Sequence, residues 1–146
     1  MVIEEFSSKI VFLDSAPLIY FIEGHSKYQE ILYKLFDFND KGGFSFITSS
    51  ITILEVLVKP LREGKAAIAK QYRDILTKAP GIEILDVTPV IAEIAAQLRA
   101  KYNLKTPDAI QLATSIDGEA GFFLTNDSRL KSINEINVVM IDELEP

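Results

Sequence analysis

The sequence predicts an α/β fold: a three-layer α/β/α sandwich with a mostly parallel central sheet. Short runs of apolar, strand-forming residues alternate along the chain with longer segments whose apolar residues recur at helical spacing. The apolar runs are nearly continuous, which is typical of strands that are covered on both faces. No segment with a linker-like composition divides the chain, so we predict a single domain over residues 1–146.

The first part of the chain begins with a predicted buried strand at residues 9–13, KIVFL. Asp14 then begins a helix, and Gly24 ends it. A second helix is predicted for residues 27–38, because its apolar residues recur at the spacing of one helix face. After a turn, the next strand is expected at residues 44–48, FSFIT.

A helix is predicted next for residues 51–59, with Ser49 or Ser50 as its N-cap and an end before Pro60. A further helix is expected over residues 62–78.

The last part of the chain continues the alternation with a strand at residues 82–87 and a helix that opens at Thr88-Pro89 and reaches about Tyr102. Thr106 is the predicted N-cap of the next helix, with Pro107 as its first residue. Two final strands are then expected, at residues 121–125 and at residues 138–141.

Composition excludes several classes of protein. The chain has no cysteine, which rules out disulfides, thiolate zinc sites and cysteine nucleophiles. It lacks an apolar stretch long enough to cross a bilayer, and its first residues do not resemble a signal peptide. We therefore expect no membrane contact and a cytoplasmic location.

The net charge of −6 argues against nucleic acid as a partner, because binding to its backbone is driven by Lys and Arg. The distribution of charge weakens this objection, since residues 59–78 carry six basic residues and only two acidic ones. Either this segment helps to bind a polyanion or it is a solvated helix face, and charge alone does not choose. The basic residues are Lys59, Arg62, Lys65, Lys70, Arg73 and Lys78.

Two carboxylates follow predicted strands, where open parallel sheets bind ligands. Asp14 comes directly after residues 9–13, and Asp127 comes just after residues 121–125. Both positions are equally consistent with a capping or turn role, because Asp is favoured there in any case.

Two further carboxylates lie within predicted helices. Asp108 falls in the first turn of its helix, where the helix dipole alone stabilises a negative charge by about 0.3–1 kcal/mol. Glu55 interrupts an apolar helix and lies on a polar stripe with Thr52 and Lys59. Glu55 either pairs with Lys59 one turn later, for about 0.2–0.5 kcal/mol, or lies at the mouth of an active site.

Four segments containing these acids closely resemble the acidic motifs of PIN-domain ribonucleases, and most of all the VapC toxins of VapBC toxin–antitoxin modules. The resemblance extends from about Val11 to Asp142, and KTPDAIQLAT is its most specific part. The segments are FLDSAPLIYFIEG, TSSITILEVLVKP, LKTPDAIQLATSI and FFLTNDSRL. The stretch from Ser132 to Glu135 departs from many relatives, which have a Pro-Gly turn there.

The resemblance implies that Asp14, Glu55, Asp108 and Asp127 are the catalytic, metal-binding acids. Carboxylate-only sites suit Mg²⁺ or Mn²⁺, so the implied activity is metal-dependent hydrolysis of RNA phosphodiester bonds. The resemblance also implies support for these acids from Ser15, Thr125 and Asn126. The single histidine, His25, is expected in a surface turn and has no predicted catalytic role.

The resemblance further implies a cognate antitoxin that blocks the pocket, and a homodimer whose contact could involve the helices between Lys59 and Ala79. Three alternatives remain open at this stage. The chain could be a PIN nuclease of RNA processing or decay without an antitoxin, or a non-catalytic module with an acidic pocket. A haloacid-dehalogenase-like phosphotransferase is disfavoured, because Ala16 stands where that family expects a second Asp.

Overall fold

The computed structural model describes residues 1–146 and contains one five-stranded sheet with the strand order β3-β2-β1-β4-β5. All neighbouring strands pair in parallel, so the predicted α/β class is confirmed and the sheet is parallel throughout. The strands are β1 (Ile10–Leu13), β2 (Ser45–Ser49), β3 (Ile82–Leu85), β4 (Phe122–Thr125) and β5 (Asn137–Met140).

Six α-helices and three short 3₁₀ helices connect the strands. The α-helices are α1 (Ser15–Glu23), α2 (Gln29–Asp40), α3 (Ser50–Arg62), α4 (Ala66–Lys78), α5 (Pro89–Lys101) and α6 (Thr106–Asp117). The 3₁₀ helices are η1 (Ile3–Phe6), η2 (Ser128–Ser132) and η3 (Ile141–Glu143). None of the helices is both long enough and apolar enough to cross a bilayer.

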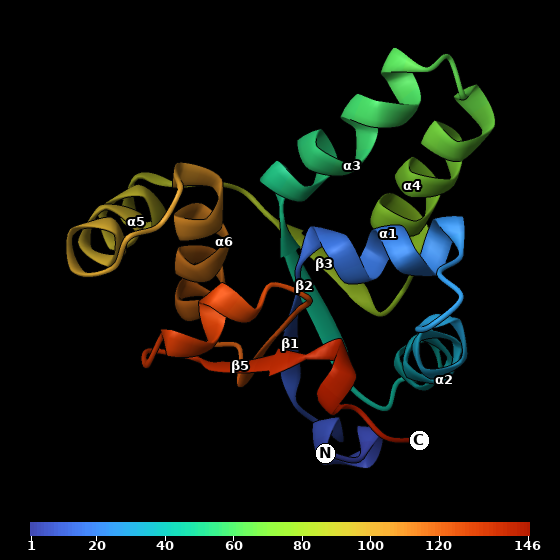
Figure 1. Ribbon diagram of the computed structural model, residues 1–146, viewed down its shortest axis with the longest axis horizontal. Coiled ribbons are helices and arrows are strands. Elements are labelled where there is room, and N and C mark those ends of the chain that lie inside the picture. The colour runs from blue at the N-terminus through green and yellow to red at the C-terminus, as the bar shows by residue number, and fades with distance from the viewer.

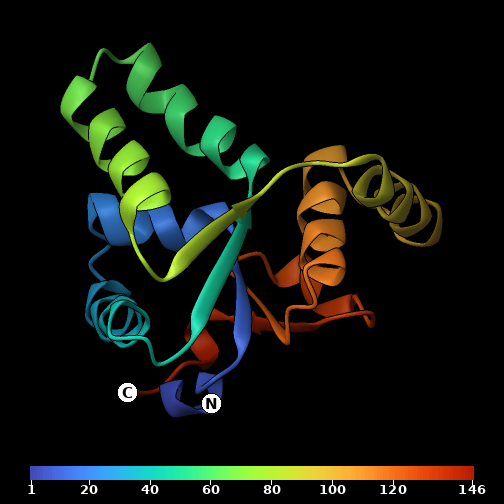
Figure 2. The same ribbon diagram turned by 180° about the vertical axis from the view of Figure 1, so that it is seen from behind.

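The helices cover both faces of the sheet, which gives the predicted three layers (Figures 1 and 2). Successive residues of β1 point to opposite faces: Leu13 packs with α1 and α2, whereas Phe12 packs with α5 and α6. Helices α3 and α4 form a hairpin that extends beyond the sheet (Figure 1).

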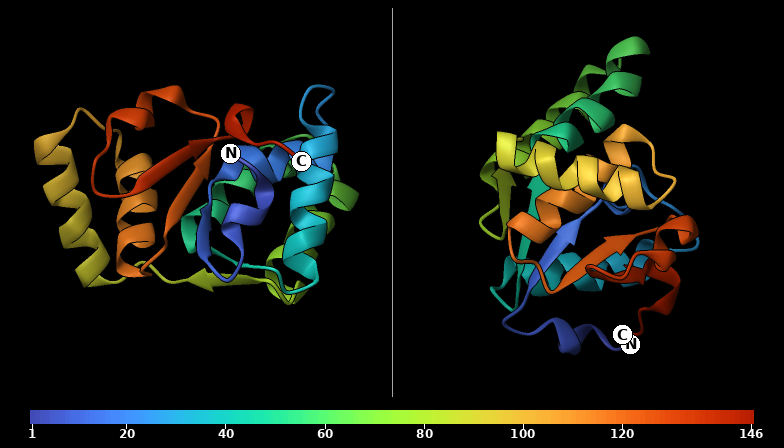
Figure 3. Two further views of the ribbon diagram at one scale, coloured as in Figure 1. Left: turned by 90° about the horizontal axis from the view of Figure 1, so that it is seen from below. Right: turned by 90° about the vertical axis from the view of Figure 1, so that its left-hand side faces the viewer.

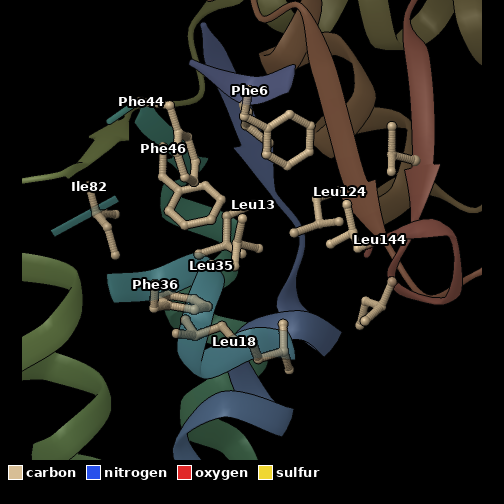
Figure 4. Close-up of a cluster of buried hydrophobic side chains, with 14 of the residues drawn as sticks. Phe6, Leu13, Leu18, Leu35, Phe36, Phe44, Phe46, Ile82, Leu124 and Leu144 are labelled. Atoms are coloured by element: carbon tan, nitrogen blue, oxygen red, sulfur yellow. The ribbon is translucent and has the colours of Figure 1, made fainter. Parts of the chain in front are cut away.

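The larger hydrophobic cluster fills the space between the sheet and helices α1, α2 and α4 (Figure 4). Leu18 of α1, Leu35 of α2 and Leu124 of β4 are fully buried there. The two ends of the chain lie side by side (Figure 3), joined by a parallel bridge between Val2 and Glu145. The bridge therefore holds together the segments that precede η1 and follow η3.

The predicted caps largely hold. Asp14, Ser49 and Thr88 each accept a hydrogen bond from a backbone amide at the start of α1, α3 and α5. The predicted cap at Thr106 is wrong, because Lys105 is the N-cap of α6 and Thr106 is its first residue. The Thr106 hydroxyl instead accepts a hydrogen bond of 2.8 Å from Arg99.

The predicted end of the third helix before Pro60 is also wrong, since α3 continues to Arg62. Pro60 lies in the last turn, where it removes only one helical hydrogen bond, and its ring is buried. Its carbonyl accepts a bond of 2.8 Å from the amide of Lys65, which closes the turn. Gly64 has a positive φ of 68° in that turn, so α4 begins only at Ala66.

Candidate active site

A pocket of about 570 Å³ opens at the carboxyl ends of β1 and β4. This is the position where the strand order reverses, because β2 lies on one side of β1 and β4 lies on the other. Ligands of open parallel sheets bind at such switch points. All four acids singled out from the sequence line this one pocket: Asp14, Glu55, Asp108 and Asp127.

Asp14 both caps α1 and lines the pocket, so the two interpretations of this residue are compatible. Its Oδ1 accepts a bond of 2.8 Å from the amide of Ser15, and its Oδ2 accepts one of 2.7 Å from the hydroxyl of Thr125. Burial raises the pKa of Asp14 to about 6, although these two hydrogen bonds oppose the rise. The nearby negative charges of Glu55 and Asp108 raise its pKa further.

Glu55 projects from α3 toward Asp14 rather than pairing along its own helix. No ion pair forms between Glu55 and Lys59. Oε1 of Glu55 instead accepts a hydrogen bond of 2.7 Å from the hydroxyl of Ser15 and one of 3.3 Å from the side-chain amide of Gln111. The predicted pair with Lys59 is therefore absent, and Glu55 faces the pocket.

Asp108 lies in the first turn of α6, as predicted. Partial burial raises its pKa, the negative charge of Asp127 adds to the rise, and the positive charges of Arg129 and Lys105 oppose it. A carboxylate in this setting gains stability from any further cation that enters the pocket.

Asp127 is already paired. It caps η2, and its Oδ2 lies 2.6 Å from Nη2 of Arg129, while Nε of Arg129 donates to Oδ1 at 3.0 Å. These bonds lower the pKa of Asp127, so its carboxylate is ionised. Of the four acids, Asp127 is the one whose two oxygens are both held by a positive side chain.

Comparison with known proteins shows which family has this arrangement. The sequence profile of the PIN domain matches residues 11–136. The chain belongs to the PIN-domain family. No curated protein matches it significantly.

Solved structures share the fold of this PIN domain over nearly their full length. VapBC2 from Rickettsia felis, bound to a DNA fragment of its promoter, has a TM-score of 0.73 at 19% identity, covering 90% of this chain and 98% of that chain. A toxin–antitoxin complex from Klebsiella pneumoniae has a TM-score of 0.69 at 26% identity, covering 90% and 97%. VapC20 from Mycobacterium tuberculosis, described as a toxin that cleaves the sarcin–ricin loop, has a TM-score of 0.66 at 14% identity, covering 87% and 98%.

The three residues predicted to support the acids all line the pocket of the PIN domain. The hydroxyl of Ser15 donates a hydrogen bond to the carboxylate of Glu55. The hydroxyl of Thr125 donates one to the carboxylate of Asp14 and accepts one of 3.1 Å from the backbone amide of Asp127. Asn126 donates a bond of 3.2 Å to the hydroxyl of Tyr20 on α1. Ser15 and Thr125 therefore connect three of the four acids through hydroxyl groups.

A buried polar chain beneath the site was not predicted. The hydroxyl of Thr48 donates a hydrogen bond of 2.7 Å to the carbonyl of Leu13 and accepts one of 2.8 Å from the hydroxyl of Thr52. The hydroxyl of Thr52 in turn accepts a hydrogen bond of 2.8 Å from the side-chain nitrogen of Gln111. This order leaves Gln111 Oε1 buried without a partner. The available signal was the pair Thr52 and Gln111, polar residues within otherwise apolar helix faces.

The role of Arg129 was also missed. It lies two residues after Asp127, and nothing in the spacing indicated that its guanidinium would occupy that carboxylate. The basic segment of residues 59–78 is in part neutralised, because Lys65 pairs with Glu63 and both Lys70 and Lys78 pair with Asp74. Three of its six cations are therefore already paired with acids of the same hairpin.

The type of residue in the pocket fits a hard divalent cation, since four carboxylates converge and Asp14 is costly to ionise without a counter-charge. As the side chains stand, no three of these carboxylates are grouped closely enough to bind one ion. Binding of one cation by three of these acids would require their side chains to move. Asp127 could contribute both of its oxygens only if Arg129 left them.

Proposed function

We propose that this PIN domain is an endoribonuclease dependent on Mg²⁺ or Mn²⁺, with Asp14, Glu55, Asp108 and Asp127 as the catalytic, metal-binding acids. One observation carries the proposal: four acids from four separate parts of the chain line a single pocket at the switch point of the sheet. Gathered carboxylates repel one another, by about 4 kcal/mol for a pair about 4 Å apart at an effective dielectric of 20. An arrangement of this kind is favoured when a cation binds there.

When bound, a divalent cation would lower the pKa of a water molecule and neutralise charge on the scissile phosphate. The chain's own part is to hold the carboxylates in position. Thr125 and the amide of Ser15 fix the two oxygens of Asp14, and the Ser15 hydroxyl fixes Oε1 of Glu55. Oε2 of Glu55 accepts no bond from the protein and is free to bind a ligand.

We also infer that the protein is the toxin of a type II toxin–antitoxin module. Support comes from the Klebsiella pneumoniae toxin–antitoxin complex and from VapC20, which is described as a toxin that cleaves the sarcin–ricin loop. RNA is accordingly the expected substrate, an antitoxin the expected partner, and the cytoplasm the expected place of action. The alternative is a PIN nuclease of RNA processing or decay without an antitoxin. A neighbouring gene for a small protein with a DNA-binding N-terminus would favour the toxin.

The test of the activity is an RNA cleavage assay with Mg²⁺ and with EDTA. Asp14→Asn and Asp108→Asn are expected to abolish cleavage, while their circular dichroism spectra remain those of the folded protein. Asp86→Asn is the matched control, because Asp86 also follows a strand, β3, but is exposed and does not line the pocket. Cleavage that survives EDTA or either pocket variant would overturn the proposal, and binding of metal without cleavage would favour a non-catalytic module.

A second test asks whether the four acids form a cation site. Millimolar Mg²⁺ is expected to raise the melting temperature of the wild type more than that of Asp14→Asn, because a ligand that binds only the folded state stabilises it. Asp86→Asn should respond as the wild type does. Equal shifts in all three proteins would count against the metal site.

We further propose that the protein is a homodimer whose contact involves the α3–α4 hairpin. Leu54, Val58 and Leu61 recur at helical spacing on α3 and are 61%, 41% and 56% exposed, which forms an apolar stripe. Leu61→Glu should lower the mass measured by light scattering, and Val90→Glu on α5 should not, although Val90 is 57% exposed. A mass that is unchanged by Leu61→Glu would exclude this contact.

A further inference from the structure

A second cleft lies directly beside the acidic pocket and has a volume of about 460 Å³. It is enclosed by the end of α5, the loop that leads into α6, and η2. Asp108 and Arg129 line both cavities, so the two spaces are adjacent at these residues. Its volume lies within the usual range for sites of small ligands, about 300–1,000 Å³.

The charge of this cleft is opposite to that of the acidic pocket. Three positive side chains line it, Arg99, Lys105 and Arg129, and Asp108 is its single carboxylate. Arg129 is paired with Asp127, so Arg99 and Lys105 are the two cations of the cleft that pair with no acid. The protein as a whole has a net charge of −6, so this grouping of cations is not a consequence of the overall composition. A positive cleft that continues a site of phosphodiester chemistry is suited to an anion.

The three cations differ in how they are held. The side chain of Arg99 is held in place by two hydrogen bonds. Its Nε donates one of 3.0 Å to the carbonyl of Leu104, and its Nη1 donates one of 2.8 Å to the hydroxyl of Thr106. Lys105 is exposed and forms neither an ion pair nor a side-chain hydrogen bond. Its charge nevertheless reaches the acidic site, since it lowers the pKa of both Asp108 and Asp127.

The backbone adds to the positive potential. Lys105 is the N-cap of α6, a helix of 12 residues whose first turn has no side-chain cap. Pro107 has no N–H and the amide of Ala109 bonds the carbonyl of Lys105, so the amides of Thr106 and Asp108 are the free donors of this turn. Free amides and the helix dipole favour an anion at such an end. Fixed donors, an unpaired lysine and a helix N-terminus thus surround the same cleft.

We propose that this cleft binds a backbone phosphate of single-stranded RNA adjacent to the bond that is cut. The inference rests on the proposed function, and it adds that Lys105 and Arg99 position the substrate without taking part in the chemistry. A chain of RNA that places its scissile phosphate in the acidic pocket extends by one nucleotide into a neighbouring space, and this cleft is the adjoining space with positive charge. The α3–α4 hairpin is less suited, because none of its six cations lines either cavity.

The experiment measures binding rather than cleavage. A short fluorescent single-stranded RNA is titrated against Asp14→Asn protein, and against the same protein carrying Lys105→Gln, at several salt concentrations. Lys105→Gln is expected to weaken binding several-fold and to reduce the slope of log Kd against log salt by about 0.7, the value for one phosphate contact with a single strand. Lys105→Glu should weaken binding further.

Lys9→Gln is the matched control. Lys9 is likewise exposed and unpaired, but it precedes β1 and therefore lies at the opposite edge of the sheet from both cavities. Lys9→Gln and Lys105→Gln change the net charge of the protein by the same amount. An effect of Lys105→Gln that exceeds that of Lys9→Gln is therefore local. Equal binding and equal salt slopes in the two variants would overturn the inference.

The outcomes separate this inference from the proposed function. Wild-type cleavage with no difference between Lys105→Gln and Lys9→Gln would leave the nuclease intact and exclude the phosphate site. Specific loss of RNA binding in Lys105→Gln, together with no cleavage by the wild type, would support the site and overturn the nuclease. Absence of RNA binding to the Asp14→Asn protein would overturn the inference directly.

Discussion

The hydroxyl of Thr125 donates a hydrogen bond of 2.7 Å to Oδ2 of Asp14, although 111 residues separate the two along the chain. Their strands make this contact possible, because β1 and β4 are neighbours and Leu13 is in register with Leu124. The same hydroxyl accepts the amide hydrogen of Asp127. One side chain therefore connects the first and the fourth acid of the site.

Thr125→Val is expected to impair cleavage with little effect on the fold, because valine has nearly the shape of threonine but no hydroxyl. In the wild type, the hydrogen bond from Thr125 lowers the pKa of Asp14. Loss of this bond in the variant should therefore raise the pKa of Asp14 above about 6. Activity at neutral pH should fall by about tenfold or more, and the acidic limb of the pH–rate profile should move to higher pH.

Thr77→Val serves as its control, since Thr77 bonds only the carbonyl of Arg73 within α4. This variant should keep the wild-type profile. An unchanged profile in Thr125→Val would show that the contact with Asp14 does not tune the site.

Asp14→Asn is expected to stabilise the metal-free protein at neutral pH. The pKa of Asp14 is about 6 in the folded state against 3.8 in the unfolded chain, so the folded state retains its proton over that interval. Stability from this residue is present below about pH 4 and is lost as the pH rises through about 6. At about 1.4 kcal/mol per pH unit, the loss is roughly 3 kcal/mol, and Asn at this position avoids it.

The measurement is urea unfolding in EDTA at about pH 4 and about pH 8. Asp14→Asn should gain over the wild type at the higher pH and lose that gain at the lower one. Asp86→Asn provides the comparison for a change of charge outside the pocket. A gain that is independent of pH would mean that ionisation of Asp14 is not its cause.

Arg129→Gln is expected to tighten the binding of Mn²⁺. In the structure, Arg129 occupies both oxygens of Asp127, so a metal ion has to displace a cation that is already bound there. Calorimetric titration should give a several-fold lower Kd for the variant. Arg73→Gln, at an exposed position on α4 that forms no ion pair, should bind as the wild type does. Weaker binding in Arg129→Gln would contradict competition between arginine and metal.

Gln111→Leu is expected to lower cleavage by about tenfold while changing the free energy of unfolding by less than about 1.5 kcal/mol. The substitution removes a donor to Glu55, which impairs the site, but it also removes a buried oxygen that has no partner. Gln97→Leu, exposed on α5, is the control. A loss of stability of about 3 kcal/mol or more with an unaltered cleavage rate would indicate a purely structural role.

Much of the fold could be predicted because local signals agreed with one another. Apolar runs marked all five strands, and capping residues such as Ser49 and Thr88 marked where helices begin. The errors occurred where a distant contact changed a local preference. Arg99 takes the hydroxyl of Thr106, so the cap of α6 moves by one residue, and burial of the ring of Pro60 accompanies the extension of α3.

The sequence alone determined the alternation of strands and helices and the positions of four acids at strand ends and within helices. It could not decide whether Asp14 and Asp127 were only caps, or whether Glu55 would pair with Lys59, because spacing describes one element at a time. The parallel pairing of β1 with β2 and β4 decided this, since it brings the ends of separate segments to one edge of the sheet.

Only the tertiary structure placed Gln111 against Glu55 and Lys105 in the cleft next to the acidic pocket. The physical reason is the range of the forces involved. Local propensities act between residues a few positions apart, whereas burial and charge depend on which groups are close in space after the chain has folded.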